Sequence, residues 1–391
     1  MQFTEEQKRI RTAIMRGGTS RALFVMRNEL PADPAVRDRV ILRLYGSPDV
    51  RQIDGLAGAD PLTSKLAIIG PPTRPDADVD YTFGQVSITD AFVDYAGNCG
   101  NISSAVGPYA IDEGLVDPVE PVTTVRIHQT NTQCILIAHV PVRNGKAAVE
   151  GDYHIDGVPG TGARIALDFA DTEGSITGRL LPTGNPVDRL EVPGVGPIEL
   201  SLVDAGTPCV FVRARDMGIA GTETPAQIDA DRELNDRIER IRGTGAAVMG
   251  MVANWQDAAK QSPYAPFFAM VSGPADYADL TGKTIKAGEV DFLSRLLFML
   301  KMHKAYAVTG TVCTGAAAKI PGTLVYEVAG VSGSHAEQTL IRIGHPAGVI
   351  TIDAQVEMRA DGPHLVQAAL ARTARRLMEG YAFVPWSTLA G

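Results

Sequence analysis

Hydrophobic and polar residues alternate along this chain in short strand-like runs, with a few longer helix-like runs between them. Apolar residues cluster at 12–16 and again at 21–26, with a Gly-Gly-Thr-Ser turn between the two runs. A Gly-Gly pair between two such runs predicts an antiparallel hairpin. Residues 30–47 are predicted to form a helix, and a strand is predicted at 66–69, with Lys65 at its start. This mixture predicts an α/β fold, or more broadly α+β.

The rest of the chain continues in the same way. Further strands are predicted at residues 81–88, 91–95, 123–128, 133–140, 164–171, 194–203, 209–213, 266–271, 341–352 (as a hairpin-like pair) and 366–384. Helices are predicted at residues 102–111, 224–243, 291–300 and 309–320. Only the helix at 224–243 has a clear apolar side opposite a charged side, which is typical of a helix packed on the surface of a sheet.

Two of the predicted helices carry apolar or small residues on all sides, and each begins at a glycine-containing turn. One turn is Gly97-Asn-Cys-Gly-Asn101, ahead of the helix at 102–111. The other is Thr309-Gly-Thr311, which opens a helix that ends before Pro321-Gly322. A helix N-terminus carries about half a positive charge and attracts carboxylates. We therefore expect each half of the chain to contain one buried helix with an anion-binding N-terminus.

Length and composition suggest two domains. The chain has 391 residues, of which 45% are hydrophobic, which is more than one core usually holds. The segment 181–188 is rich in glycine and proline and is the best linker candidate. We predict one domain from residues 1–182 together with 366–391, and a second from residues 183–365.

Charge and cysteine content exclude several classes of function. The net charge is −9 with no basic cluster, so neither nucleic acid nor an anionic membrane is an expected partner. No apolar run reaches the roughly 20 residues of a membrane span. The four cysteines lie far apart without a CxxC pair, so neither a disulfide framework nor a metal site is indicated. We expect a reduced, cytoplasmic protein.

Lys65 and Cys99 are the candidate chemical groups. A lysine flanked by small and apolar residues, if desolvated, loses charge readily and can act as a base near neutral pH. Cys99 lies at a predicted helix N-terminus, where the pKa of a thiol falls. The alternatives are an exposed edge-strand lysine and a small buried cysteine. Packing roles are expected for Cys134, Cys209 and Cys313.

Five ordered motifs together resemble the PrpF family, which includes 2-methylaconitate isomerase, 4-oxalomesaconate tautomerase and methylitaconate delta-isomerase. These motifs are MRGGTS at 15–20, DPLTSK at 60–65, NCGN at 98–101, PGT at 321–323 and GHPAG at 344–348. The resemblance spans nearly the whole chain. It implies the diaminopimelate epimerase-like fold: two similar domains, each a curved sheet or barrel around a central helix, with the active site in the cleft between them. It implies no metal and no organic cofactor.

The resemblance also implies roles for individual residues. Lys65 matches the family's proposed base, and Cys99 matches its active-site thiol. In the epimerase relatives a second cysteine stands at the tip of the second helix, and Thr309 aligns with it here, which speaks against two-thiol racemisation. His345 is either cleft-facing or a surface residue in its turn. The expected substrate contacts are Gly18, Thr19, Ser20, Ser64, Asn98, Gly100, Asn101, Thr309, Gly310, Thr311 and His345.

These residues suggest a cofactor-independent isomerase of a small unsaturated di- or tricarboxylate. Lys65 would remove an allylic proton, two helix N-termini would stabilise the dienolate, and Lys65 or Cys99 would protonate the far carbon. One alternative is an epimerase-type or PhzF-like reaction on an amino or hydroxy acid. Another is a non-catalytic accessory protein that binds aconitate-like ligands. The expected partner is a small polycarboxylate, and a homodimer is left open.

Overall fold

The computed structural model describes residues 6–330 and 338–389. The chain forms two compact units, one from Met1–Leu167 with Ala371–Gly391 and the other from Asp168–Leu370. Residues 181–188 therefore lie inside the second unit. Each unit is a mixed α/β structure with parallel and antiparallel strand pairs, in agreement with the predicted fold class.

The first unit is built mainly of strands, with two α-helices. Its elements are β1 (Gln7–Gly17), β2 (Ser20–Met26), α1 (Pro34–Tyr45), β3 (Lys65–Gly70), β4 (Val79–Val86), β5 (Val93–Asp94), α2 (Gly100–Asp112), β6 (Val122–Gln129), β7 (Cys134–Arg143), β8 (Lys146–Ala147), β9 (Ile165–Asp168, at the boundary) and β21 (Ala374–Pro385), with 3₁₀ turns at Arg27–Glu29 and Trp386–Thr388.

The second unit has more helices. Its elements are β10 (Asp188–Val192), β11 (Gly196–Val203), β12 (Cys209–Arg213), α3 (Pro225–Ala230), α4 (Arg232–Val248), α5 (Ala258–Gln261), β13 (Phe267–Ser272), β14 (Tyr277–Ala278), β15 (Thr284–Ile285), β16 (Phe292–Phe298), β17 (Lys301–Met302), α6 (Val308–Lys319), α7 (Leu324–Val328), β18 (Leu340–His345), β19 (Gly348–Arg359) and β20 (Gly362–Arg372, crossing the boundary), with 3₁₀ turns at Ala170–Thr172, Ala214–Met217, Trp255–Asp257 and Ala287–Glu289.

The two units repeat one strand topology. In the first unit, β1–β2 and β3–β4 pair antiparallel, β2–β3 and β4–β6 pair parallel, and β6–β7 closes the series antiparallel. In the second unit, β11, β12, β13, β16, β18 and β19 pair in the same alternation. In both, one fully buried helix, α2 or α6, lies in the sequence between the fourth and fifth strands of the series. The architectural repeat expected from the two apolar helices is therefore present, although the two sequences match poorly.

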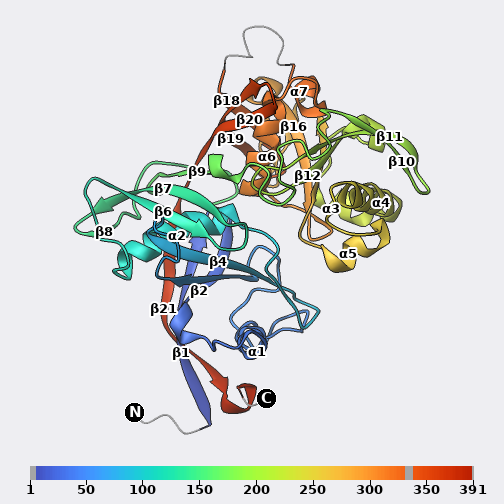
Figure 1. Cartoon of the computed structure of the whole chain (residues 1–391). Helices are drawn as coiled ribbons and strands as arrows, with labels where there is room; N and C mark the ends of the chain where they lie inside the picture. Colours follow the sequence, from blue (N-terminus) through green and yellow to red (C-terminus); the bar gives the residue numbers. More distant parts are fainter. Residues whose placement is uncertain (1–5, 331–337, 390–391) are drawn as a thin grey trace. The chain divides into compact units, whose positions relative to one another are not determined.

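The helices α2 and α6 are buried because they have no polar side. Every residue of α2 from Gly100 to Ile111 is buried, and so is every residue of α6 from Val308 to Ala318. Such a helix is stable only when other elements cover it all round. Strands β1, β2, β3, β6, β7 and β21 contact α2 (Figure 1), and strands β11, β12, β18 and β19 contact α6. Each unit thus holds the N-terminus of its central helix in a fixed, low-dielectric position.

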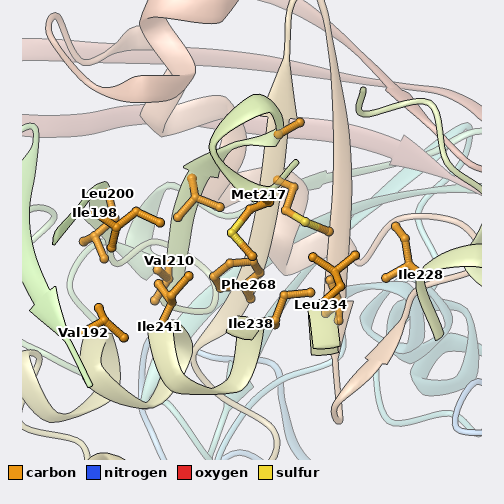
Figure 2. Packing of buried hydrophobic residues seen from close by; sticks show 14 of the residues in the cluster. Val192, Ile198, Leu200, Val210, Met217, Ile228, Leu234, Ile238, Ile241 and Phe268 are labelled. Carbon is orange, nitrogen blue, oxygen red and sulfur yellow. The ribbon is translucent and has the colours of Figure 1, made fainter. Parts of the chain in front are cut away.

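The largest described core cluster of the second unit lies between α4 and the strands. The apolar side of α4 presents Leu234, Ile238 and Ile241, which face side chains such as Val210 and Phe268 (Figure 2). All five are at most 4% exposed. Burial of each large apolar side chain stabilises the fold by about 1.5–3 kcal/mol. The amphipathic helix predicted at 224–243 therefore exists, but it is divided into α3 and α4 at Asp231. Asp231 is the N-cap residue of α4, and its side chain accepts a hydrogen bond from the Leu234 amide.

The helix predicted at residues 291–300 is wrong. These residues form β16 and the turn after it. Strand β16 pairs with β13 on one side and β18 on the other, and all its residues are buried. A continuous apolar run suits a strand covered on both faces as well as it suits a buried helix, so the pattern alone does not separate them. The hairpin-like pair at 341–352 is confirmed as β18 and β19.

The buried carboxylate of Asp80 ties several elements of the first unit together. Its Oδ2 accepts from Arg27 Nη2 at 2.7 Å, and its Oδ1 lies 2.9 Å from His128 Nδ1 and 3.0 Å from the Thr73 amide nitrogen. Burial raises the pKa of Asp80, but hydrogen bonds from Arg27, Thr73 and His128 lower it, and the net shift is downward. The ionised carboxylate is therefore favoured in the folded protein.

Low pH should remove the stabilisation that the ionised Asp80 carboxylate gives to the fold. A carboxylate whose pKa is depressed on folding stabilises the protein above its unfolded pKa, and that stability is lost as pH falls through the folded pKa. We expect Asp80→Asn to lower the free energy of unfolding by about 2–4 kcal/mol at pH 7. The deficit should shrink as denaturant unfolding is repeated at lower pH, below pH ~4. An equal deficit at pH 7 and pH 3 would contradict the assignment.

Candidate active site

The β1–β2 hairpin turn packs directly on the start of α2. Gly18 has a φ of +50°, and a Cβ there would lie 1.9 Å from Asn101 Oδ1. A Cβ on Gly17 would lie 2.3 Å from the Asn101 backbone oxygen. A side chain at either position would push the turn away from the helix, so the Gly-Gly pair is required by this contact as well as by the turn.

Asn101 links the turn to the helix. Its Oδ1 accepts from the Thr19 amide at 3.3 Å, and its Nδ2 donates to Thr19 Oγ1 at 3.1 Å. Arg372 Nε also donates to Asn101 Oδ1, at 3.2 Å. Next along β2, Ser20 is 3% exposed, and its hydroxyl has no hydrogen-bond partner within residues 6–330 and 338–389. Thr19, Ser20 and Asn101, predicted from the sequence as substrate contacts, are therefore grouped in one place.

Cys99 is the N-cap residue of α2, and no side chain caps this helix. By contrast, Asp33 caps α1 and Asp231 caps α4 through their carboxylates. Because the first amide groups of a helix have no partner within the helix, an uncapped and buried N-terminus offers free donors to an anion. Gly100 is the first residue of α2, so no side chain covers these groups at that position. Cys99 itself is 8% exposed.

Asn98 precedes the N-cap residue Cys99 and is hydrogen-bonded to the first turn of α2. Its Oδ1 accepts from Ser103 Oγ at 3.1 Å, and Ser103 also donates to the Cys99 backbone oxygen through its amide nitrogen, at 2.9 Å. Asn98 is 2% exposed. These bonds hold the NCGN turn against the first turn of the helix, which fixes the Cys99 backbone.

Lys65 begins β3 and is buried, with 2% of its surface exposed. Its Nζ donates to Gln85 Oε1 at 2.7 Å and lies 5.4 Å from the centre of the Phe83 ring. Burial lowers the pKa of Lys65, and the nearby Cys99 and Asp60 act in the opposite direction. The amine is therefore within electrostatic range of Cys99 and is shifted toward the neutral form, as a base requires. The exposed edge-strand alternative is wrong.

Gln85 and Ser64 form the support of Lys65. Gln85 Nε2 donates to the backbone oxygens of Ser64 and Pro61, at 3.0 Å and 3.2 Å, so its carbonyl oxygen must face Lys65. Ser64 is fully buried; its hydroxyl donates to the Val86 oxygen at 2.9 Å and accepts from Gln52 Nε2 at 2.8 Å. Ser64, predicted as a substrate contact, has its hydroxyl occupied within the protein and orients the loop before Lys65.

The second unit contains an analogous turn and helix start. Gly206, with a φ of +68°, packs against Thr309, whose backbone oxygen would lie 2.7 Å from a Cβ at Gly206. Thr207 Oγ1 donates to Thr309 Oγ1 at 2.9 Å. Thr311 donates back to the Ala307 oxygen through its amide, at 2.7 Å, and through its hydroxyl, at 3.0 Å. Helix α6, like α2, has no side-chain cap.

The helix α6 starts earlier than predicted, and this changes one alignment. Its first residue is Val308, its N-cap is Ala307, and Thr309 is its second residue. Asn101 is likewise the second residue of α2. By helix position, Ala307 is therefore the counterpart of Cys99, and Thr309 is the counterpart of Asn101. Gly310 is packed tightly, because a Cβ there would lie 2.6 Å from Leu296 Cδ1.

His345 ends β18 and is 2% exposed, so it is not a surface residue. Its Nδ1 accepts from the Ala347 amide at 3.2 Å, and its ring centre is 6.1 Å from that of Tyr306. Burial raises the pKa of Tyr306, whose hydroxyl pairs with Ser294 Oγ at 2.6 Å and Thr314 Oγ1 at 3.0 Å. His345 therefore belongs to a buried polar group in the second unit.

All four cysteines are buried, but their surroundings differ. Cys209 and Cys313 are fully buried, and burial raises the pKa of both thiols. Cys134 Sγ donates to the Thr132 oxygen at 3.2 Å, and Cys313 Sγ to the Val203 oxygen at the same distance. The packing roles predicted for these three cysteines agree with their burial.

Thiol labelling should separate Cys99 from the fully buried cysteines. Only a thiolate reacts at a useful rate, and burial suppresses the thiolate of Cys209 and Cys313. In native protein treated briefly with iodoacetamide, we expect Cys99 to be alkylated first, and Cys209 and Cys313 only after unfolding. Peptide mass spectrometry measures the extent at each site. Equal native labelling of Cys313 and Cys99 would contradict this expectation.

Sequence reasoning missed Gln85, Arg372 and Thr207 as parts of these two groups. Gln85 gave a weak signal, because a glutamine inside an alternating strand has to find partners if it faces the core. Arg372 is separated from Asn101 by 271 positions and Thr207 from Thr309 by 102. Only the fold brings these pairs together.

The described residues contain neither a metal-binding cluster nor a membrane-spanning helix. No group of three or more His, Cys, Asp or Glu side chains in residues 6–330 and 338–389 is arranged to hold a metal ion. Within the same ranges, no helix combines the length and hydrophobicity that crossing a bilayer requires.

Comparison with known proteins matches nearly the whole chain. A family model described as "PrpF protein" matches residues 7–385. The chain is 56% identical to 3-methylitaconate isomerase of Eubacterium barkeri, covering 97% of this chain and 98% of the relative. It is 42% identical to 2-methyl-aconitate isomerase of Shewanella oneidensis (strain ATCC 700550 / JCM 31522 / CIP 106686 / LMG 19005 / NCIMB 14063 / MR-1), covering 97% and 98%.

Solved structures also resemble this chain over nearly its whole length. The crystal structure of methylitaconate-delta-isomerase is 55% identical, with a TM-score of 0.82 and coverage of 99% of this chain and 98% of that chain. A hydroxyproline epimerase from Agrobacterium vitis is only 10% identical, with a TM-score of 0.56 over 98% of this chain and 93% of that chain. That second likeness concerns the fold alone, and it agrees with the predicted epimerase-like fold.

Proposed function

Because this chain belongs to the PrpF protein family, we propose that it is an isomerase that moves a carbon–carbon double bond in a small unsaturated dicarboxylate of the methylitaconate type. The identity of 56% with 3-methylitaconate isomerase over almost the full length of both chains supports this substrate class. The observation that carries the chemistry is a buried amine with a lowered pKa, close to a thiol at the uncapped N-terminus of a buried helix.

Lys65 acts as the base in this proposal. A neutral amine removes the proton from the carbon that is allylic and next to a carboxylate. The electron pair moves into the carboxylate and the neighbouring double bond, which gives a dienolate. Lowering the pKa of Lys65 by burial raises the neutral fraction near pH 7. The bond from Nζ to Gln85 keeps the amine in one place, so that the geometry of attack is set before the substrate binds.

The start of α2 stabilises the charge that develops on the carboxylate oxygens. The free amide groups after Cys99, with Thr19, Ser20 and Asn101, offer donors in a buried setting. Donors that are already oriented are worth more there than in water, because they need no reorganisation during the reaction. Removal of one such donor typically costs 10²–10³-fold in rate, about 2.7–4 kcal/mol. Thr309, Gly310, Thr311 and His345, in the second unit, remain predicted contacts of the substrate.

The second proton transfer completes the shift. Either the new ammonium group of Lys65 or the thiol of Cys99 protonates the far carbon, so that a methylene group becomes a methyl group. If Cys99 is the donor, its thiolate recovers a proton from Lys65 or from solvent before the next turnover. Both routes balance the proton count without a cofactor.

Two substrate alternatives follow from the relatives. A tricarboxylate such as 2-methylaconitate is the substrate named for the relative at 42% identity, and oxalomesaconate belongs to the same chemical type. An epimerase reaction is the second alternative, because an epimerase shares the fold. It is less well supported: by helix position the counterpart of Cys99 is Ala307, so a second thiol is missing from that position.

A substrate panel tests the proposal. Purified protein is incubated with 3-methylitaconate, 2-methylaconitate, cis- and trans-aconitate, and oxalomesaconate, and double-bond movement is followed by ultraviolet absorbance and proton NMR. The expected result is turnover with the highest kcat/KM on the methyl-substituted dicarboxylate. No movement of a double bond in any compound of the panel would overturn the proposal and leave the epimerase alternative in its place.

A further inference from the structure

Arg372 is a buried cation for which the fold provides no counter-charge. It is 6% exposed, and among residues 6–330 and 338–389 no carboxylate forms an ion pair with it. Its described partners are neutral oxygens: Nε donates to Asn101 Oδ1 at 3.2 Å, and Nη1 donates to the Ala371 backbone oxygen at 2.8 Å. The half-buried Arg376, four positions later, does have a carboxylate partner, since it pairs with Glu113 at 2.8 Å. The neutral surroundings of Arg372 therefore require a separate explanation.

Burial of an arginine without a counter-charge is costly. Burial lowers the pKa of Arg372 to about 10, so the group stays charged at neutral pH. An uncompensated charge inside a protein costs several kcal/mol, and buried charges are normally paired. An anionic ligand would supply the missing charge. This argument points to a carboxylate, because its neighbours in the fold, the turn at Thr19 and the start of α2, also present donors.

Arg372 also fixes the hydrogen-bond pattern of its neighbours. A guanidinium has only donors, so the Asn101 atom that faces it must be the oxygen. Asn101 Oδ1 is then occupied by Arg372 and by the Thr19 amide, and Nδ2 donates to Thr19 Oγ1. Because the Thr19 hydroxyl accepts there, its own proton is directed elsewhere. What this group offers to a ligand is therefore hydrogen-bond donors: the Thr19 hydroxyl and the second Asn101 N–H.

Two further observations agree with a surface that can donate hydrogen bonds to an anion. The Ser20 hydroxyl, on the residue next to Thr19, is buried and has no partner in the described part of the chain. The backbone oxygen of Thr373 accepts from the Gly18 amide at 2.9 Å and from Arg16 Nη1 at 2.9 Å, which holds the turn beside Arg372. A surface of donors around a cation favours a carboxylate over the matching neutral amide or ester, because only the carboxylate supplies the counter-charge.

We propose that Arg372 is a positioning and specificity residue, which orients Asn101 and Thr19 and supplies the counter-charge for one carboxylate of the substrate. The proposal rests on the function proposed above. It adds that this carboxylate is recognised by the turn at residues 17–20 together with the first turn of α2, through Arg372. It also adds that a monoamide of the substrate at this carboxylate binds more weakly, because it lacks the charge that Arg372 requires.

The experiment compares four variants with the native protein: Arg372→Gln, Arg372→Lys, Asn101→Asp and the control Arg375→Gln. Arg375 is exposed on the same C-terminal segment. The probe is propane-1,2,3-tricarboxylate, which carries carboxylates but no double bond, and its binding is measured by calorimetry. Steady-state kinetics on the best substrate of the panel gives KM and kcat separately.

We expect Arg372→Gln to weaken probe binding by about 10- to 100-fold, the value of a charge-assisted hydrogen bond or two. KM should rise by a similar factor while kcat changes less, a split that a general loss of packing would not produce. Arg372→Lys should recover part of the affinity because it keeps the charge, and Arg375→Gln should bind as the native protein does.

Asn101→Asp keeps the test valid if Arg372→Gln does not fold. It gives Arg372 an internal carboxylate, so we expect a melting temperature no lower than native but binding at least about tenfold weaker. Native-like binding by either Arg372→Gln or Asn101→Asp, or no probe binding by the native protein, would overturn the inference. Absence of turnover with intact, Arg372-dependent probe binding would instead refute the proposed reaction and leave this inference standing.

Discussion

Replacement of Lys65 by alanine should abolish isomerisation, with a fall in kcat of about 10²–10⁴-fold or more, since a positioned general base contributes that much. The amine is the only described candidate base that is buried beside the uncapped start of α2 and has a lowered pKa. Lys65→Met is the cleaner variant, because it keeps the aliphatic volume and removes only the basic nitrogen. Stopped assays at high enzyme concentration measure the residual rate.

The fold should survive both changes. Lys65 Nζ bonds to Gln85, so its loss leaves one buried acceptor without this donor, at a cost of about 1–3 kcal/mol. Lys301→Ala is the matched control, because Lys301 also begins a strand, β17, but is exposed. Denaturant unfolding and activity of this control should match the native protein. Wild-type turnover by folded Lys65→Ala would refute the role assigned to Lys65.

The hairpin and the two apolar helices could be predicted from the sequence because local rules determine them. The Gly-Gly turn needs a left-handed residue at Gly18, and helix 102–111 has no polar side. Once a helix has to be buried all round, its N-terminus lies inside the protein. The positions of Cys99 and Lys65, at a helix cap and a strand start, follow from the same local reading.

Other features depend on contacts that no local pattern contains. The run 291–300 is mainly a strand because β13 and β18 pair with its two edges. Only the tertiary structure places those two strands beside it. Its central Arg295 is 1% exposed and donates to the Glu223 backbone oxygen at 2.8 Å. This buried guanidinium finds its partner in a backbone carbonyl 72 positions away, which no local pattern indicates.

The repeated topology explains why one unit carries the chemistry proposed here. Lys65 starts β3, whereas the corresponding third strand of the second unit, β13, starts with two phenylalanines, Phe267 and Phe268. Lys65 faces Gln85 across the pair β3–β4, and across β13–β16 Phe268 faces Leu297. Cys99 is the N-cap residue of α2, and Ala307 is the N-cap residue of α6. The same framework thus holds an amine and a thiol in the first unit and apolar groups at the matching positions of the second.

With one thiol and one amine, Cys99→Ser should reduce activity by less than Lys65→Ala does. If Lys65 both removes and returns the proton, the thiol only orients the substrate or donates a hydrogen bond, and serine keeps a donor of similar size. Removal of Cys99 also removes an interaction that raises the pKa of Lys65. A base is active in its neutral form, so the acid limb of the kcat/KM profile should move to lower pH in Cys99→Ser.

Proton NMR in deuterated water separates the two routes of proton return. A single lysine that shuttles the proton keeps some substrate hydrogen in the product, although the other ammonium hydrogens dilute it. A transfer from Lys65 to the far carbon through Cys99 draws that hydrogen from a thiol that exchanges with solvent, so deuterium enters almost fully. We expect partial retention in the native protein and in Cys99→Ser, with the latter clearly more active than Lys65→Ala. Full deuterium incorporation, together with a Cys99→Ser variant as inactive as Lys65→Ala, would exclude the one-base route and make Cys99 the second acid.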